Sequence, residues 1–219
     1  MRPRHHTPRR SRAGFTFLEV MIAVTLLAVI AGSAALVGRR GTDAFRNTSA
    51  RTVAEAEARR AIGRIAQELQ EAMPDTVSPV AGFPAGSDTL DFRRGEDFVA
   101  GAVVLSDLCR IELRPEPGEA DNGADDDGDG LVDECIVVLV KDVLGANEQE
   151  AVLARNVREL GLGEVANGLD DDGDGLEDEP GFCLVVVDEV VRLWLSVEHV
   201  GAEGERFEVA VETSVEFRN

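Results

Sequence analysis

Residues 15–37 read FTFLEVMIAVTLLAVIAGSAALV, and this stretch decides the architecture of the N-terminal part of the chain. It contains 23 residues with a single ionisable side chain, Glu19. At a rise of about 1.5 Å per residue, a helix of this length crosses a bilayer core of about 30 Å. Five arginines lie within residues 1–14, which favours a cytoplasmic start and export of the C-terminal remainder of the chain. The sequence therefore predicts a membrane-spanning helix over residues 15–37.

Helical character continues beyond this apolar stretch. Residues 43–73 contain no proline and one glycine. Apolar residues recur three and four positions apart, which indicates a stripe along one helix face: Ile62, Ile65, Ala66, Leu69 and Met73. Pro74 is expected to end the helix, because it has no N–H and clashes with the preceding turn. We predict an amphipathic continuation over residues 38–73.

After residue 74 the pattern changes to that of β-strands. Short apolar or alternating runs occupy residues 99–105, 108–114 and 135–141. Residues 191–197 and 207–217 alternate apolar and polar side chains, which predicts two strands with one buried face, joined by a loop at 199–206. The amphipathic helix would cover the sheet. The predicted fold class is α+β, with a β-rich globular domain over residues 74–219.

The junction between the basic and apolar segments reads Arg12-Ala13-Gly14-Phe15-Thr16-Phe17-Leu18-Glu19. It resembles the signal of type IV prepilins and type II secretion pseudopilins. In that family a prepilin peptidase cuts after the glycine and methylates the new amino terminus, and a glutamate occupies the fifth mature position. The resemblance implies a cleaved leader over residues 1–14, cleavage after Gly14, methylation of Phe15 and an assembly role for Glu19. Phe17 departs from the leucine or threonine usual at the third mature position.

An ionised carboxylate inside an apolar helix costs several kcal/mol unless it is paired. In the family, the proposed partner of the glutamate is the freed amine of a neighbouring subunit. Such a pair would set the stagger between adjacent helices, as polar core residues set register in coiled coils. The alternative is a Glu19 side chain that reaches the membrane surface.

The remainder of the chain resembles minor pilins and minor pseudopilins of the J-like and W-like kinds. The features that carry this resemblance are a long helix ending near RRAIGRIAQELQEAM, a strand-rich body and a closing strand that ends at Phe217-Arg218-Asn219. The resemblance implies a bacterial inner-membrane protein with its globular domain in the periplasm or at the cell surface. Its partners would be prepilin peptidase and other pilins or pseudopilins. A pilus, a secretion system and a DNA-uptake system remain open.

One short segment is repeated at an offset of 45 residues. Residues 122–134 read NGADDDGDGLVDE and residues 167–179 read NGLDDDGDGLEDE. Both resemble the calcium loops of the EF-hand, dockerin and thrombospondin type 3 families, and calcium prefers six to eight oxygen ligands. The resemblance implies two calcium ions. Their ligands would come from Asp125, Asp127, Asp129, the carbonyl of Leu131, Asp133 and Glu134, and from Asp170, Asp172, Asp174, the carbonyl of Leu176, Asp178 and Glu179.

A complete EF-hand is not expected, because its twelfth position falls on Ile136 and Gly181 instead of glutamate. We therefore expect calcium loops inserted between strands. The alternative is a solvated acidic linker. Thirteen carboxylates in the two segments would repel one another without a cation, which favours calcium.

The chain has three cysteines and a formal net charge of -20. This charge argues against nucleic-acid binding, which needs clustered Lys and Arg. Cys109 and Cys135 flank the first acidic segment, and we favour a disulfide between them. Cys183 could pair with either, and three reduced thiols are the remaining alternative. Trp194, on the polar side of its strand, is expected to be packed or to form an exposed contact.

We find no catalytic motif, and the leading interpretation is a structural assembly subunit, not an enzyme. The second interpretation is a membrane-anchored calcium-binding surface protein whose anchor is not cleaved. The third is an exported hydrolase stabilised by calcium, for which the catalytic residues are missing.

Overall fold

The computed structural model describes residues 16–201 and 204–217, without the side chains of Asp43, Ala44 and Asn47. The chain divides into two compact units, Met1–Phe45 and Arg46–Asn219. The predicted junction of Gly14 and Phe15 lies outside the described residues. Helix α1, Phe17–Gln70, contributes to both units, so a long N-terminal helix and the α+β class are confirmed.

In the first unit, α1 presents apolar side chains to its surroundings. The segment Phe17–Thr42 has a mean hydropathy of 2.6, and none of it is buried. Its hydroxyls bond to carbonyls of the same helix, as in Thr25 Oγ1 to Ile22 O at 2.9 Å and Ser33 Oγ to Ile30 O at 2.9 Å. These bonds satisfy polar atoms without water, as a helix in lipid requires. The segment is long and apolar enough to cross a membrane.

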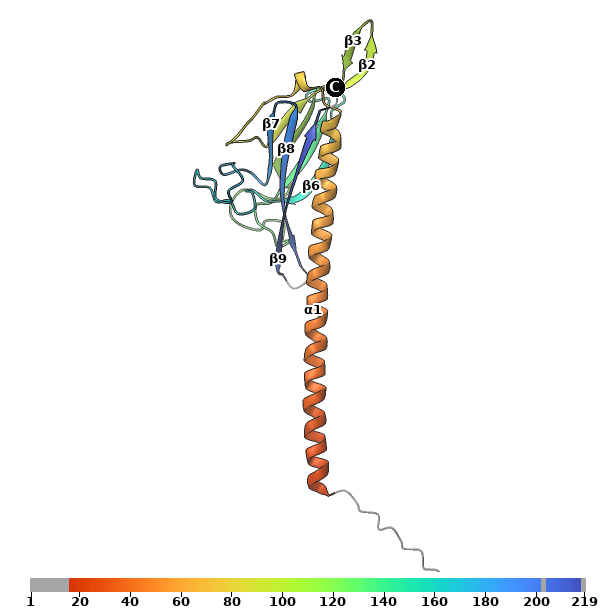
Figure 1. Cartoon of the computed structure of the whole chain (residues 1–219), viewed down its shortest axis with the longest axis vertical. Coiled ribbons are helices and arrows are strands. Elements are labelled where there is room, and N and C mark those ends of the chain that lie inside the picture. The colour runs from red at the N-terminus through yellow and green to blue at the C-terminus, as the bar shows by residue number, and fades with distance from the viewer. Residues whose placement is uncertain (1–15, 202–203, 218–219) are drawn as a thin grey trace, which may run out of the picture. The chain divides into compact units, whose positions relative to one another are not determined.

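The second unit combines the remainder of α1 with an antiparallel sheet (Figure 1). In the described part of this unit, seven strands join in the order β1-β4-β5-β6-β8-β7, and β9 also pairs with β8. The strands are β1 Thr89–Phe92, β4 Cys109–Pro115, β5 Cys135–Lys141, β6 Gln149–Val157, β7 Phe182–Val187, β8 Val190–Val200 and β9 Arg206–Glu216. The predicted terminal hairpin is confirmed as β8 and β9.

The core lies between α1 and one face of the sheet. The helix contributes buried side chains three and four positions apart: Ala54, Ala58, Ala61, Ile62, Ile65 and Leu69. Of the predicted stripe, Ile62, Ile65 and Leu69 are buried, Ala66 is partly buried, and Met73 lies beyond the end of the helix. The sheet contributes buried residues to the same core, which include Phe92, Ile111, Leu139 and Leu193. The helix ends at Gln70, earlier than predicted, and Pro74 begins a 3-10 helix, Pro74–Thr76. A residue before proline is disfavoured in the α conformation, which agrees with Met73 at φ -84° and ψ 120°.

The prediction of a single strand over residues 99–105 is wrong. Ala100 and Gly101 have φ values of 54° and 86°, which form a two-residue hairpin turn. This turn separates β2, Gly95–Val99, from β3, Ala102–Leu105, and the two form their own small sheet.

The predicted disulfide between Cys109 and Cys135 is also wrong. Cys109 lies opposite Lys141, and Cys135 lies opposite Pro115, so the two occur at opposite ends of the β4–β5 ladder. Six positions of strand separate them by about 20 Å, whereas a disulfide needs Cα atoms within about 7 Å. All three cysteines are free and buried.

Candidate functional site

The N-terminal motif enters the described residues at Thr16. Thr16 Oγ1 accepts a hydrogen bond from the Glu19 N–H at 3.2 Å and so caps the first turn of α1. The Glu19 side chain lies in this turn and is exposed. The sequence has no basic residue between positions 16 and 38. A counter-charge for Glu19 must therefore come from outside this helical segment.

Two acidic loops connect strands of the second unit. The first loop, residues 122–134, lies between β4 and β5, and the second loop, residues 167–179, lies between β6 and β7. This is the predicted position, between strands. The repeated segment begins earlier than expected, because Gly118-Glu119 and Gly163-Glu164 also lie 45 residues apart.

The aspartates of both loops make the same hydrogen bonds. Asp125 accepts from the N–H groups of Gly128 at 2.6 Å and Gly130 at 3.0 Å, and Asp170 accepts from Gly173 and Gly175 at the same distances. The glycines have φ values between 85° and 99°, a conformation that other residues rarely adopt. Asp127 and Asp129 each accept one bond from the backbone N–H two residues later, at 2.8–3.0 Å. Asp172 and Asp174 do the same in the second loop, at 2.8–2.9 Å. Two identical sets of bonds indicate that the repeat encodes one defined loop structure.

Asp133 and Asp178 close the loops. Asp133 accepts from the N–H groups of Asn122 at 2.9 Å and Gly123 at 2.8 Å. Asp178 accepts from the equivalent groups, Asn167 at 2.8 Å and Gly168 at 2.6 Å. A carboxylate oxygen of Asp133 lies within 4.8 Å of oxygens of Asp121 and Glu159. Asp133 belongs to no described group with the aspartates at the centre of the loop. These two predicted ligands therefore join the ends of the loops.

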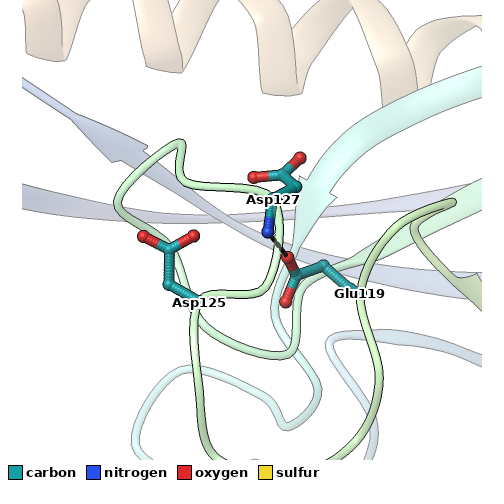
Figure 2. A group of neighbouring side chains, drawn as sticks. All are labelled: Glu119, Asp125 and Asp127. Carbon is teal, nitrogen blue, oxygen red and sulfur yellow. Dashed lines mark hydrogen bonds between the residues drawn. The ribbon is translucent and has the colours of Figure 1, made fainter.

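Two glutamates that the sequence analysis missed reach into the loops from the preceding segment. Glu119 Oε1 accepts from the N–H of Asp126 at 3.1 Å and of Asp127 at 2.9 Å, and Figure 2 shows the latter bond. Glu164 Oε1 makes the equivalent bonds to Asp171 and Asp172, both at 3.0 Å. The signal that could have found them is the repeated Gly-Glu pair, six residues before the first aspartate of each loop.

The remaining predicted carboxylates come together with these glutamates. Groups whose oxygen atoms lie within 4.8 Å of one another are Glu119–Asp125–Asp127 and Asp127–Asp129–Glu134 in the first loop, and Glu164–Asp172–Glu179 and Asp170–Asp172–Asp174 in the second. Asp127 and Asp172 belong to both groups of their loops. That the backbone carbonyls of Leu131 and Leu176 are calcium ligands stays a prediction.

Several of these carboxylates are removed from water. Glu134 and Glu179 are each 3% exposed. Both oxygens of Glu134 and one oxygen of Glu179 have no hydrogen-bond partner among the described residues. Burial raises the pKa of Glu134 to about 7, and neighbouring carboxylates, Asp129 foremost, add to this rise. Burial likewise raises the pKa of Glu179 to about 7, with Glu164 as the main neighbouring charge.

An unpaired buried carboxylate costs several kcal/mol, and clustered like charges add to that cost. A hard divalent cation would relieve both, and all-oxygen groups of this kind are what calcium prefers. The loops therefore offer chemistry suited to calcium.

The second loop is anchored to the sheet through an apolar cluster. Leu176, fully buried, packs with Cys183 and Val185, and Trp194 packs against them. The Trp194 ring meets Phe83 edge-on at 6.1 Å between centroids. Trp194 is thus packed by side chains from outside its strand. It also lines a cavity with Asp172, Asp174 and Glu179, so the indole lies beside the acidic group.

Comparison with known proteins identifies one family feature. The prokaryotic N-terminal methylation motif matches residues 9–35. A search of curated proteins and a search of solved structures each gave no match. The motif, together with the apolar helix, supports a type IV pilin-like protein, and a motif of this kind implies processing by prepilin peptidase, membrane anchoring and assembly with other pilins.

Proposed function

We propose that the chain is a non-enzymatic minor subunit of a type IV pilus or of a type II secretion pseudopilus, with an exported domain that calcium stabilises. The observation that carries this proposal is the coincidence of the methylation motif at 9–35 with the apolar helical segment Phe17–Thr42. In this proposal residues 1–14 are the leader, cleavage follows Gly14, and Glu19 lies at the fifth mature position of the apolar helix.

Glu19 supplies the reason why processing and assembly would be linked. Cleavage after Gly14 creates an amine at Phe15, which is absent from the precursor. No basic residue lies between positions 16 and 38 to neutralise Glu19. The amine of a neighbouring processed subunit is then the counter-charge, and a charge pair in lipid is favoured strongly enough to select one stagger.

The second unit supports the role of a folded domain on the exported side. Its sheet and helix residues 54–69 share one apolar core. The two acidic loops carry buried carboxylates without described partners, which supports calcium as a structural ion.

Mass spectrometry of the protein extracted from membranes tests the proposal. We expect an N-terminus at Phe15 that carries one methyl group. The variant Gly14→Leu should retain residues 1–14, because the peptidase needs a small residue before the scissile bond. Retention of residues 1–14 in the wild-type protein would contradict the proposal and favour a surface protein with an uncleaved anchor.

A further inference from the structure

The two acidic loops each receive a carboxylate from outside the aspartate run. Glu119 and Glu164 follow Gly118 and Gly163, whose φ values of 117° and 104° turn the chain back toward the loop. Each glutamate then accepts two backbone N–H bonds from the loop centre. The second carboxylate oxygen of Glu119 is buried without a partner among the described residues.

We propose that Glu119 and Glu164 are calcium ligands, each completing the shell of an ion held at Asp127 or Asp172. This inference rests on the proposed calcium binding and adds to it a ligand that the loop sequence alone does not contain. It assigns Asp133 and Asp178 to loop closure, outside the shell.

The second loop carries the argument furthest. Glu164 is 5% exposed and Glu179 is 3% exposed, and their oxygens lie within 4.8 Å of each other and of Asp172. Glu179 Oε2 and Asp174 Oδ2 are buried without a described hydrogen-bond partner. Among the described residues that line the neighbouring cavity, none carries a positive charge. Three converging carboxylates, two of which line this cavity without a described cation, fit a bound cation.

The first loop repeats this arrangement. Glu119 lies with Asp125 and Asp127, and Glu134 lies with Asp127 and Asp129. Glu134 has two unpartnered oxygens among the described residues although it is 3% exposed. Carboxylates from three separate positions, namely before the loop, within it and at its end, thus meet at Asp127. Calcium tolerates such a flexible, oxygen-rich shell, whereas magnesium needs a tighter octahedron.

The competing explanation is that Glu119 and Glu164 only brace the loop backbone. At Glu119, glutamine keeps an oxygen that can accept the same two N–H bonds but loses the charge, so a brace would survive the change. At Glu164 the change also removes the acceptor of a third bond, from the Asp178 N–H to Oε2 at 3.2 Å. Loss of that bond could weaken affinity even in a brace, but it would add no water to the bound ion, whereas loss of a calcium ligand would. Glu177 offers a matched control, because it is an exposed carboxylate of the second loop that belongs to none of the described acidic groups.

Terbium(III), which is similar to calcium in radius and in its preference for oxygen, provides a probe specific for the second loop. The chain contains one tryptophan and no tyrosine. Since Trp194 lines the cavity with Asp172, Asp174 and Glu179, terbium emission excited through tryptophan reports this loop. The full chain in detergent micelles would be titrated with terbium, and calcium would be added as a competitor.

We expect Glu164→Gln to weaken the terbium affinity at least about tenfold. Glu177→Gln and Glu119→Gln should leave this signal unchanged. Calorimetry detects calcium binding at both loops, whereas terbium emission excited through Trp194 reports only the second. Glu119→Gln should therefore weaken the calcium binding of the first loop in calorimetry. At saturating terbium, emission lifetimes in light and heavy water should reveal an additional coordinated water in Glu164→Gln, because water replaces the lost ligand.

An unchanged hydration number in Glu164→Gln, whatever its affinity, would overturn the assignment and leave a brace. If Glu164→Gln fails to fold by circular dichroism, Glu164→Asp keeps the charge but shortens the reach. Wild-type affinity in that variant would also overturn the assignment. Wild-type protein without terbium emission or calcium heat would refute the calcium sites together with this inference, whereas the Phe15 mass measurement is independent of both.

Discussion

Removal of calcium should lower the free energy of unfolding of the second unit, and the two loops should contribute about equally to this loss. Each loop brings carboxylates from several positions together, and Asp127 and Asp172 occupy the centres. An ion that binds only the folded state stabilises it by about 2.7 kcal/mol when its free concentration is ~100 times the dissociation constant. Two equivalent sites would therefore contribute about 5 kcal/mol under such conditions.

This free energy can be converted to a melting temperature. For a chain of this size, 1 kcal/mol shifts Tm by about 2–4 °C. We thus expect calcium to raise Tm by roughly 5–10 °C per site. Extracellular calcium modules often have dissociation constants of about 10⁻⁴–10⁻³ M, so calcium concentrations of tens of millimolar are needed to approach this limit.

The assay is thermal unfolding of the full chain in detergent micelles, followed by circular dichroism with calcium and then with a chelator. Asp127→Ala and Asp172→Ala should each remove about half of the calcium-dependent shift, and Glu177→Gln should keep it. Magnesium should replace calcium poorly, because it sheds water reluctantly. A melting temperature that is the same in calcium and chelator would refute the reasoning and return both loops to solvated acidic linkers.

Two further predictions concern the core and the thiols. Leu69→Ala, at a fully buried position of α1 against the sheet, should destabilise the second unit by about 2–5 kcal/mol in denaturant unfolding; Leu144→Ala, at a 95% exposed position, should have almost no effect, and an equal loss in both variants would contradict the packing described. Burial raises the pKa of Cys135 to about 11 and of Cys183 to about 12, and also raises that of Cys109, so a maleimide should label none of them in the folded protein at neutral pH. Three thiols should react after denaturation without reductant, and fewer would reveal a disulfide.

Much of the fold followed from periodicity. The terminal hairpin was predictable because its strands alternate between one wet and one buried face. Strand β7 was missed because FCLVVV is buried on both faces and has no alternation to detect. Strand β6 was missed because shifts in the register of its pairing with β5 interrupt the alternation of buried and exposed residues.

The candidate metal sites were predictable only in part. The aspartate run identifies the loops, because its spacing is repeated with the same glycines. Neither the closing role of Asp133 nor the approach of Glu119 can be derived from the spacing, since both depend on how the chain turns back on itself. The cysteine pairing failed for a related reason. Proximity in sequence to one loop does not specify strand register, and register placed Cys109 and Cys135 at opposite ends of a ladder.

The central claim, that Glu19 couples processing to assembly, is tested most directly by incorporation of Glu19→Val into fibres or cross-linked membrane complexes. The matched control is Ser33→Val, which also makes α1 more apolar but removes only a hydroxyl bonded within its own helix. We predict that both variants insert in the membrane and lose residues 1–14, that Ser33→Val is recovered in complexes at the wild-type level, and that Glu19→Val is recovered poorly. Equal recovery of Glu19→Val, Ser33→Val and wild-type protein would contradict the account.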